Sequence, residues 1–154
     1  MTIRNEFEVP GTPQGKARAR TFYNARLGRS QSVTPEKTVL YENFVKNCFL
    51  EQCEHKFFDK EPLKMNIWAF FPIPKSTTKK DKALMVEWKL HPTKKPDADN
   101  IAKVICDALN GVAYGDDTQV VDLNIRKRYT NKEPRVLVYI ETMGKDDEMD
   151  LHRQ

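Results

Sequence analysis

Alternation of apolar and polar residues predicts four β-strands, at residues 3–9, 63–72, about 118–128 and 135–142. In the first of these, Phe7 and Val9 share one face while charged residues occupy the other. The second becomes apolar on both faces toward its end, which is typical of an interior strand. The last two are separated by a turn around residues 131–134.

Apolar residues at helical spacing predict three helices, at residues 34–54, 76–88 and 99–109. The first begins with Thr34 as an N-cap candidate and Pro35 at the first helical position. The second is shorter and basic. The third has a buried stripe and ends at Gly111; the stripe consists of Ala102, Ile105, Cys106 and Leu109.

The segment between the first strand and the first helix, about residues 11–33, contains few apolar residues and is rich in Gly, Pro, Arg and Lys. It predicts a long basic loop. With 154 residues the chain has the size of one domain. We expect an α+β fold: a single compact domain over residues 1–142, with a mixed β-sheet packed by helices, and a charged, flexible tail at 143–154.

The composition excludes several classes of protein. Charged residues make up 31% of the chain and hydrophobic ones 39%, a balance typical of a soluble globular protein. No apolar run reaches the length of a signal peptide or a membrane span, so we expect a cytoplasmic protein without a membrane partner. Cys48, Cys53 and Cys106 are odd in number and form no Cys-x-x-Cys pair, which argues against a disulfide framework and a zinc cluster.

The net charge is only +4, but acidic residues gather between residues 96 and 122. Asp97 and Asp99 lie at the start of the third predicted helix, and Asp116 and Asp117 follow a loop after its end. If the fold returned that pair to the helix start, four carboxylates would repel each other unless a hard cation neutralised them. Each feature also has an ordinary structural interpretation, as helix caps and a turn.

Lys103 follows Asp99 by four residues and therefore lies on the same helical face. By itself it could be a surface partner of Asp99 or of Asp107. The spacing alone does not decide between this and a role in chemistry.

The order of these residues resembles the signature of the RusA family of Holliday-junction resolvases. Residues 95–100 read KPDADN, Lys103 follows, and then come DALNG at 107–111 and DDTQV at 116–120. The pattern G-x-P-x-x-K-x-R-x-R from Gly11 is similar to the opening loop of the family. The resemblance covers roughly residues 3–142.

The resemblance implies that Asp97, Asp99 and Asp117 are metal-binding catalytic acids and that Lys103 is essential for cleavage. Asp116 matches a neighbouring acid that would also contact the metal. Asn100, Asp107 and Gln119 also fit the family pattern. For these three residues, a structural role in orienting the helix and the loop is at least as good an interpretation as a role in catalysis. The implied cofactor is Mg²⁺, which Mn²⁺ could replace; the implied substrate is branched DNA, cut by a homodimer, and such proteins are often prophage-borne.

DNA affinity is expected from basic side chains, namely Lys16, Arg18, Arg20, Lys94, Lys95, Arg126 and Arg128. Lysines at positions 79, 80 and 82 could add to it or could be solvated surface. Trp68, Phe70 and Phe71 could form a dimer interface or belong to the core.

Other functions remain open at this stage. A restriction-enzyme pattern is excluded because no acid-x-lysine triplet follows Pro96-Asp97 in the right setting. A non-catalytic DNA-binding module, an inactive interaction protein of the same fold, and a nuclease for flaps or single strands are the alternatives. Metal-dependent nicking of a four-way junction would distinguish them.

Overall fold

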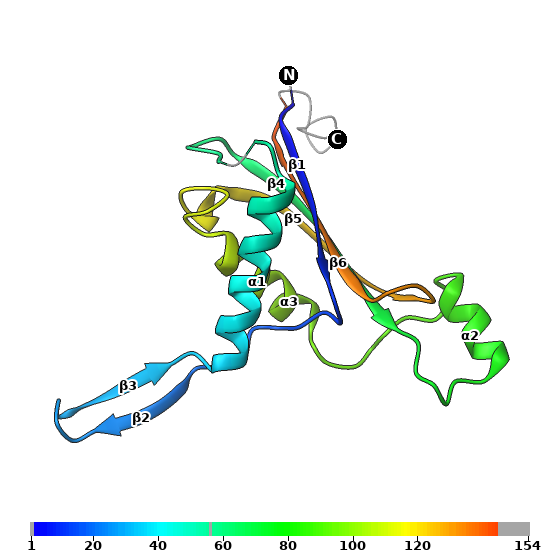
Figure 1. Cartoon of the computed structure of the whole chain (residues 1–154), viewed down its shortest axis with the longest axis horizontal. Coiled ribbons are helices and arrows are strands. Elements are labelled where there is room, and N and C mark those ends of the chain that lie inside the picture. Colours follow the sequence, from blue (N-terminus) through cyan, green and yellow to red (C-terminus); the bar gives the residue numbers. More distant parts are fainter. Residues whose placement is uncertain (1, 56, 145–154) are drawn as a thin grey trace, which may run out of the picture.

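The computed structural model describes residues 2–55 and 57–144 and has an α+β fold, as predicted (Figure 1). A four-stranded mixed sheet has the order β1-β6-β4-β5 and is built from β1 (Arg4–Pro10), β6 (Arg135–Thr142), β4 (Leu63–Pro72) and β5 (Val120–Thr130). Its neighbours pair antiparallel except β4 and β5, which are parallel. The expectation that residues 63–72 form an interior strand is confirmed.

Two helices, α1 (Glu36–Gln52) and α3 (Ala98–Leu109), lie on one face of the sheet (Figure 1). They pack against each other, α1 against β1 and α3 against β5. The core fills the space between them and the sheet, and its fully buried side chains include Val9, Val45, Phe49, Ile67, Ile105, Leu109 and Val138. Each large apolar side chain buried there stabilises the fold by roughly 1.5–3 kcal/mol.

The third helix, α2 (Lys79–Val86), lies at the end of the sheet, away from α1 and α3 (Figure 1). It begins where Thr78 accepts a hydrogen bond from the backbone N–H of Asp81, 3.2 Å away. The side chain of Trp88, just after α2, donates to the backbone carbonyl of Tyr129 on β5. This contact ties the short helix to the sheet edge.

The opposite face of the sheet carries aromatic and arginine side chains; we call it the outer face and define it by Trp68, Phe70, Trp88, Arg126, Arg128, Arg135 and Tyr139. Guanidinium groups lie over the rings, with Arg126 4.8 Å from the ring centre of Trp68. Phe71 points to the other side and belongs to the core. Of the three aromatics that could form an interface, Trp68 and Phe70 therefore lie on the outer face and Phe71 does not.

The prediction of a long loop at residues 11–33 is wrong in part, because β2 (Arg20–Asn24) and β3 (Arg29–Val33) form an antiparallel hairpin there. The hairpin projects away from the rest of the molecule (Figure 1). Its strands are held by cross-strand polar pairs such as Thr21 with Ser32. Because it buries no apolar face, the alternation that reveals a strand is missing from its sequence.

The remaining boundaries differ from the predicted ones by a few residues. Pro35, expected at the first helical position, is the N-cap of α1. A short 3₁₀ turn, η1 (Asp117–Gln119), occupies the predicted start of β5. The predicted flexible tail lies outside the described residues beyond Gly144. Among the helices that the structure describes, none has the length and apolar character to cross a membrane.

Candidate active site

Asp97 occupies the N-cap position of α3, but its side chain does not cap the helix. Its backbone carbonyl accepts from the N–H of Ile101, while its carboxylate accepts from the side-chain amide of Asn100, 3.3 Å away. Asp99 lies in the first turn, and both aspartates are exposed. Asp97 is thus an N-cap by position without a side-chain cap bond, and the positive end of the helix dipole favours its negative charge there.

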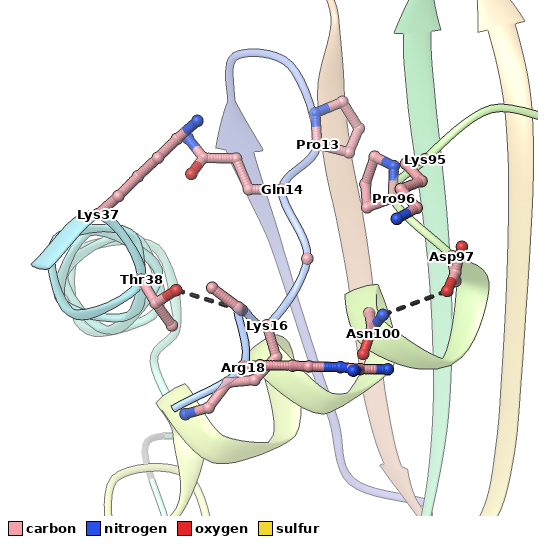
Figure 2. A pocket seen from close by; sticks show the side chains of 12 residues that line it. Pro13, Gln14, Lys16, Arg18, Lys37, Thr38, Lys95, Pro96, Asp97 and Asn100 are labelled. Atoms are coloured by element: carbon pink, nitrogen blue, oxygen red, sulfur yellow. Dashed lines mark hydrogen bonds between the residues drawn. The ribbon is translucent and has the colours of Figure 1, made fainter. Parts of the chain in front are cut away.

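The segment just before the hairpin packs against the start of α3 (Figure 2). The backbone N–H of Lys16 donates to the carbonyl of Asn100 at 3.0 Å, and the N–H of Ala17 donates to the hydroxyl of Thr38 on α1. A Cβ on Gly15 would stand 2.8 Å from the Cβ of Pro96. Only a residue without a side chain allows this approach.

A cavity of about 700 Å³ opens between this segment, the first turn of α1 and the start of α3. Figure 2 shows Lys37 and Thr38 on α1 at one side of it and Asp97 and Asn100 on the other. Its cationic lining residues are Lys16, Arg18, Lys37 and Lys95. Lys37 was not predicted from the sequence, because nothing in the pattern around the start of α1 sets this lysine apart from an ordinary surface residue.

Lys16 joins the two helices through its ammonium group. The ammonium contacts the carboxylates of Glu42 on α1 and Asp107 on α3, the latter at 3.2 Å. Burial alone would lower the pKa of Lys16, but these two carboxylates outweigh it and the pKa is raised. With 19% of its side chain exposed, Lys16 is bound to protein acids, although the sequence analysis assigned it to DNA.

Asp107 also pairs with Lys103, whose ammonium lies 3.9 Å from the same carboxylate oxygen. Lys103 is 62% exposed, so this contact is loose and open to water. The structure thus contains the predicted i,i+4 pair of Lys103 and Asp107. Because Lys103 is exposed, its ammonium is still available to a ligand.

Gln119 holds the loop that carries Asp116 and Asp117. Its side-chain oxygen accepts from the backbone N–H groups of Gly115 and Asp116, at 2.8 and 3.1 Å. Its amide nitrogen donates to the carbonyls of Phe58 and Glu61. One side chain therefore fixes the position of both aspartates with four hydrogen bonds.

Asp117 lies close enough to Lys103 and Asp107 to interact with them electrostatically. Partial desolvation, a hydrogen bond with Asp116 and repulsion from Asp116 and Asp107 raise the pKa of Asp117. The same hydrogen bond lowers the pKa of Asp116. The two carboxylates are thus a like-charged pair whose pKa values are moved in opposite directions.

Asp116 and Asp117 lie in the loop that leads from α3 to β5. Because α3 crosses between two parallel strands, the chain reaches β5 only after running the length of the helix. The pair therefore lies beside Lys103 and Asp107. Along α3, Lys103 lies one turn after Asp99 and one turn before Asp107.

The donors fit a hard divalent cation in their chemistry. They are carboxylate oxygens, and a cation would relieve the repulsion that Asp117 feels from Asp116 and Asp107. Within residues 2–55 and 57–144, no three or more His, Cys, Asp or Glu side chains form a ready-made metal cluster. Mg²⁺ at phosphate-transfer sites is often held by one or two carboxylates together with water and substrate phosphate, so this set still fits.

The other basic residues expected to bind DNA lie in three places. Arg18 and Lys95 line the cavity beside Asp97, and Lys94 lies next to Lys95, where its backbone carbonyl accepts from the ammonium of Lys127. Arg20 is exposed on β2. Arg126 and Arg128 are on the outer face, away from α3, over the ring of Trp68.

Comparisons with known proteins agree with the resemblance in the sequence. The family model "Endodeoxyribonuclease RusA" matches residues 10–141 of this chain. The chain is also similar to a Bacillus subtilis (strain 168) protein described as "Uncharacterized protein YqaN". The two are 36% identical over 137 residues, which cover 88% of this chain and 94% of that protein.

Proposed function

The chain belongs to the RusA family of endodeoxyribonucleases, and on this basis we propose that it is a Mg²⁺-dependent nuclease that resolves four-way DNA junctions by paired nicks. The observation that carries the proposal is the position of Asp117. The loop before β5 puts this aspartate beside Lys103 on the helix that begins at Asp97, so both halves of the family motif meet on α3. A domain that only bound DNA would gain nothing from an aspartate held beside this lysine.

In this proposal Asp97, Asp99 and Asp117 hold the divalent cation, with Asp116 beside them. Held there, the cation would supply a nucleophilic water and would stabilise the charge that builds on the phosphate. Mn²⁺, which accepts the same oxygen donors, would substitute for Mg²⁺.

Lys103 acts on the phosphate itself. Its ammonium is exposed and held only loosely by Asp107, so it can turn toward a phosphate oxygen and stabilise negative charge there. Asn100 orients the carboxylate of Asp97, and Gln119 fixes the loop of Asp117. These two are positioning residues.

Symmetry and charge support a four-way junction as the substrate. A four-way junction presents two equivalent strands about an approximate two-fold axis, and a two-fold homodimer would place one active site on each. The cavity next to Asp97 is lined by Arg18, Lys37 and Lys95, which suits the phosphates of a DNA strand. A flap nuclease would have the same chemistry, and only the substrate distinguishes it.

The test compares Asp97→Asn with wild type for metal-dependent nicking of a synthetic four-way junction. We expect Asp97→Asn to lose at least about 10²-fold in rate, because the cation that stabilises the transition state loses a charged ligand. Binding to the junction in EDTA should stay equal or become tighter, because one negative charge near the phosphates is removed.

Asp81→Asn is the matched control, since Asp81 is an exposed aspartate in the first turn of α2. It should cut at the wild-type rate. Normal cutting by Asp97→Asn would contradict the proposed site, and no metal-dependent cutting by wild type on any DNA would favour a binding module.

A further inference from the structure

The β2–β3 hairpin is a projecting element whose charge is of one sign. Residues 11–35 contain no Asp or Glu, and their five cations are Lys16, Arg18, Arg20, Arg26 and Arg29. Lys16 pairs with acids of α1 and α3, and the four arginines form no ion pair among the described residues. The hairpin is therefore a cationic ribbon that extends into solvent (Figure 1).

Two adjacent aromatic residues of this ribbon face water. Phe22 is 47% exposed and Tyr23 67% exposed, and their cross-strand neighbours are the polar residues Gln31 and Ser30. Because successive residues of a strand point to opposite faces, the two rings lie on opposite sides of the ribbon. Each ring exposes apolar surface that nothing in the domain covers.

A ribbon of this kind requires a partner to become rigid. An isolated two-stranded hairpin is at best marginally stable in water, and this one packs on no other strand of the described sheet. Its arginines would repel a second copy of the same ribbon. The charge complements a polyanion, and exposed rings among arginines are what bases of unpaired nucleic acid stack on.

The root of the hairpin fixes where this partner would lie. The backbone N–H of Lys16 is hydrogen-bonded to Asn100, which itself orients Asp97, and the segment from Pro13 to Arg18 lines the cavity beside Asp97. DNA held on the hairpin would therefore continue past the carboxylates of α3.

We propose that Phe22 and Tyr23 stack on nucleobases exposed at the branch point of the DNA, while Arg20, Arg26 and Arg29 bind the flanking phosphates. This rests on the proposed function and gives the source of its selectivity for branched DNA. Bases at a branch point lose a stacking neighbour, so a ring can replace it at little cost, whereas in linear duplex every base is already stacked.

The experiment uses the full chain in EDTA, so binding is measured without cutting. A synthetic four-way junction carries 2-aminopurine beside the branch point, and its fluorescence and affinity are compared with those of linear duplex. Phe22→Ala/Tyr23→Ala should bind the junction about 5- to 100-fold more weakly and abolish the fluorescence change, with duplex binding unaltered. Phe22→Trp/Tyr23→Trp should restore both.

Leu27→Ala is the matched control, because Leu27 is an apolar residue of the same hairpin, 53% exposed, without a ring. It should leave junction binding and fluorescence at wild-type values. Thermal unfolding should be the same for all variants, since none of these side chains contacts the core.

Equal junction affinity and fluorescence for wild type and Phe22→Ala/Tyr23→Ala would overturn the proposal. An equal loss of affinity for duplex and junction would also overturn it. So would a loss of the dimer in sedimentation with unchanged DNA affinity, because the hairpin would then bind a second copy of the chain. Because no cutting is involved, these results are separate from the Asp97→Asn test of the nuclease itself.

Discussion

Asp107 forms ion pairs with two lysines, Lys16 and Lys103, and the two contacts differ in distance and exposure. Lys16 is the closer and less exposed partner, at 3.2 Å, and Lys103 the more distant and exposed one, at 3.9 Å. By neutralising Asp107, Lys16 weakens the hold of this carboxylate on Lys103. The proposed phosphate-binding ammonium therefore depends on a residue outside the motif on α3.

Lys16→Met tests this dependence. Without the ammonium, Glu42 and Asp107 lose the charge that holds them together, and the free energy of unfolding in urea should fall by about 2 kcal/mol. Asp107 should then bind Lys103 more tightly, and the rate of cutting at saturating DNA should fall. Adding Asp107→Asn should recover part of the stability.

The opposite result would support the prediction from the sequence, in which Lys16 contacts DNA. If Lys16→Met were as stable as wild type and only bound DNA more weakly, with an unchanged rate at saturation, Lys16 would be a DNA contact.

The sequence predicted the types of residue in the site better than their arrangement. Asp97, Asp99, Lys103 and Asp117 stand out because family members share their order. Nothing in that order indicates that Lys16, more than 80 residues earlier, packs between α1 and α3, or that Asp117 lies beside Lys103. Such contacts depend on tertiary packing, which local spacing does not encode.

At the scale of elements, the loop before β5 is held by one side chain. Gln119 makes four hydrogen bonds, two of them to the N–H groups of Gly115 and Asp116. The position of Asp116 and Asp117 therefore depends on one side-chain amide. Loss of this amide should affect metal binding before it affects the fold.

Gln119→Ala should raise the Mg²⁺ concentration needed for half-maximal cutting by about 10- to 100-fold, the usual effect of removing a group that orients metal ligands. Gln52→Ala is a matched control, because the side chain of Gln52 makes a similar pair of hydrogen bonds, 2.8 Å each, to the backbone of Glu8 away from the site. An unchanged Mg²⁺ requirement in Gln119→Ala would show that the loop does not bind the metal.

Elements that bury a face were predictable and those that do not were missed. The stripe of α3 and the alternation of β4 and β6 reflect burial against one core, so helical and strand periods appear in the sequence. The strands β2 and β3 bury no apolar side and pair through Thr21, Ser32, Asn24 and Gln31. Their polar, arginine-rich sequence is that of a loop, and only the pairing in space distinguishes them.

At the scale of the whole molecule, the outer face is the best surface for the proposed dimer. Trp68 stacks on Phe70 and lies tilted against Trp88, with Arg126 and Arg128 over its ring. Within the described chain the Nε of Arg128 is buried without a hydrogen-bond partner, which a second subunit could supply. This face lies opposite α1 and α3, so two subunits joined through it would keep both copies of α3 free (Figure 1).

Trp68→Glu should therefore convert a dimer into a monomer in sedimentation at micromolar concentration, because it puts a charge into an aromatic interface. Leu50→Glu is the control: Leu50 is 42% exposed on α1, in the layer of helices, and the variant should remain dimeric. A dimer that survives Trp68→Glu, with circular dichroism unchanged, would place the interface elsewhere and leave Arg126 and Arg128 as candidates for DNA contact.

Whether the chain is a metal-dependent nuclease selective for junctions is tested by cleaving a four-way junction and a linear duplex of the same sequence, with and without Mg²⁺. We expect paired, symmetrical nicks in the junction alone, dependent on Mg²⁺ and lost in Asp117→Asn. Metal-independent cutting, full activity of Asp117→Asn, or equal cutting of the linear duplex would contradict it.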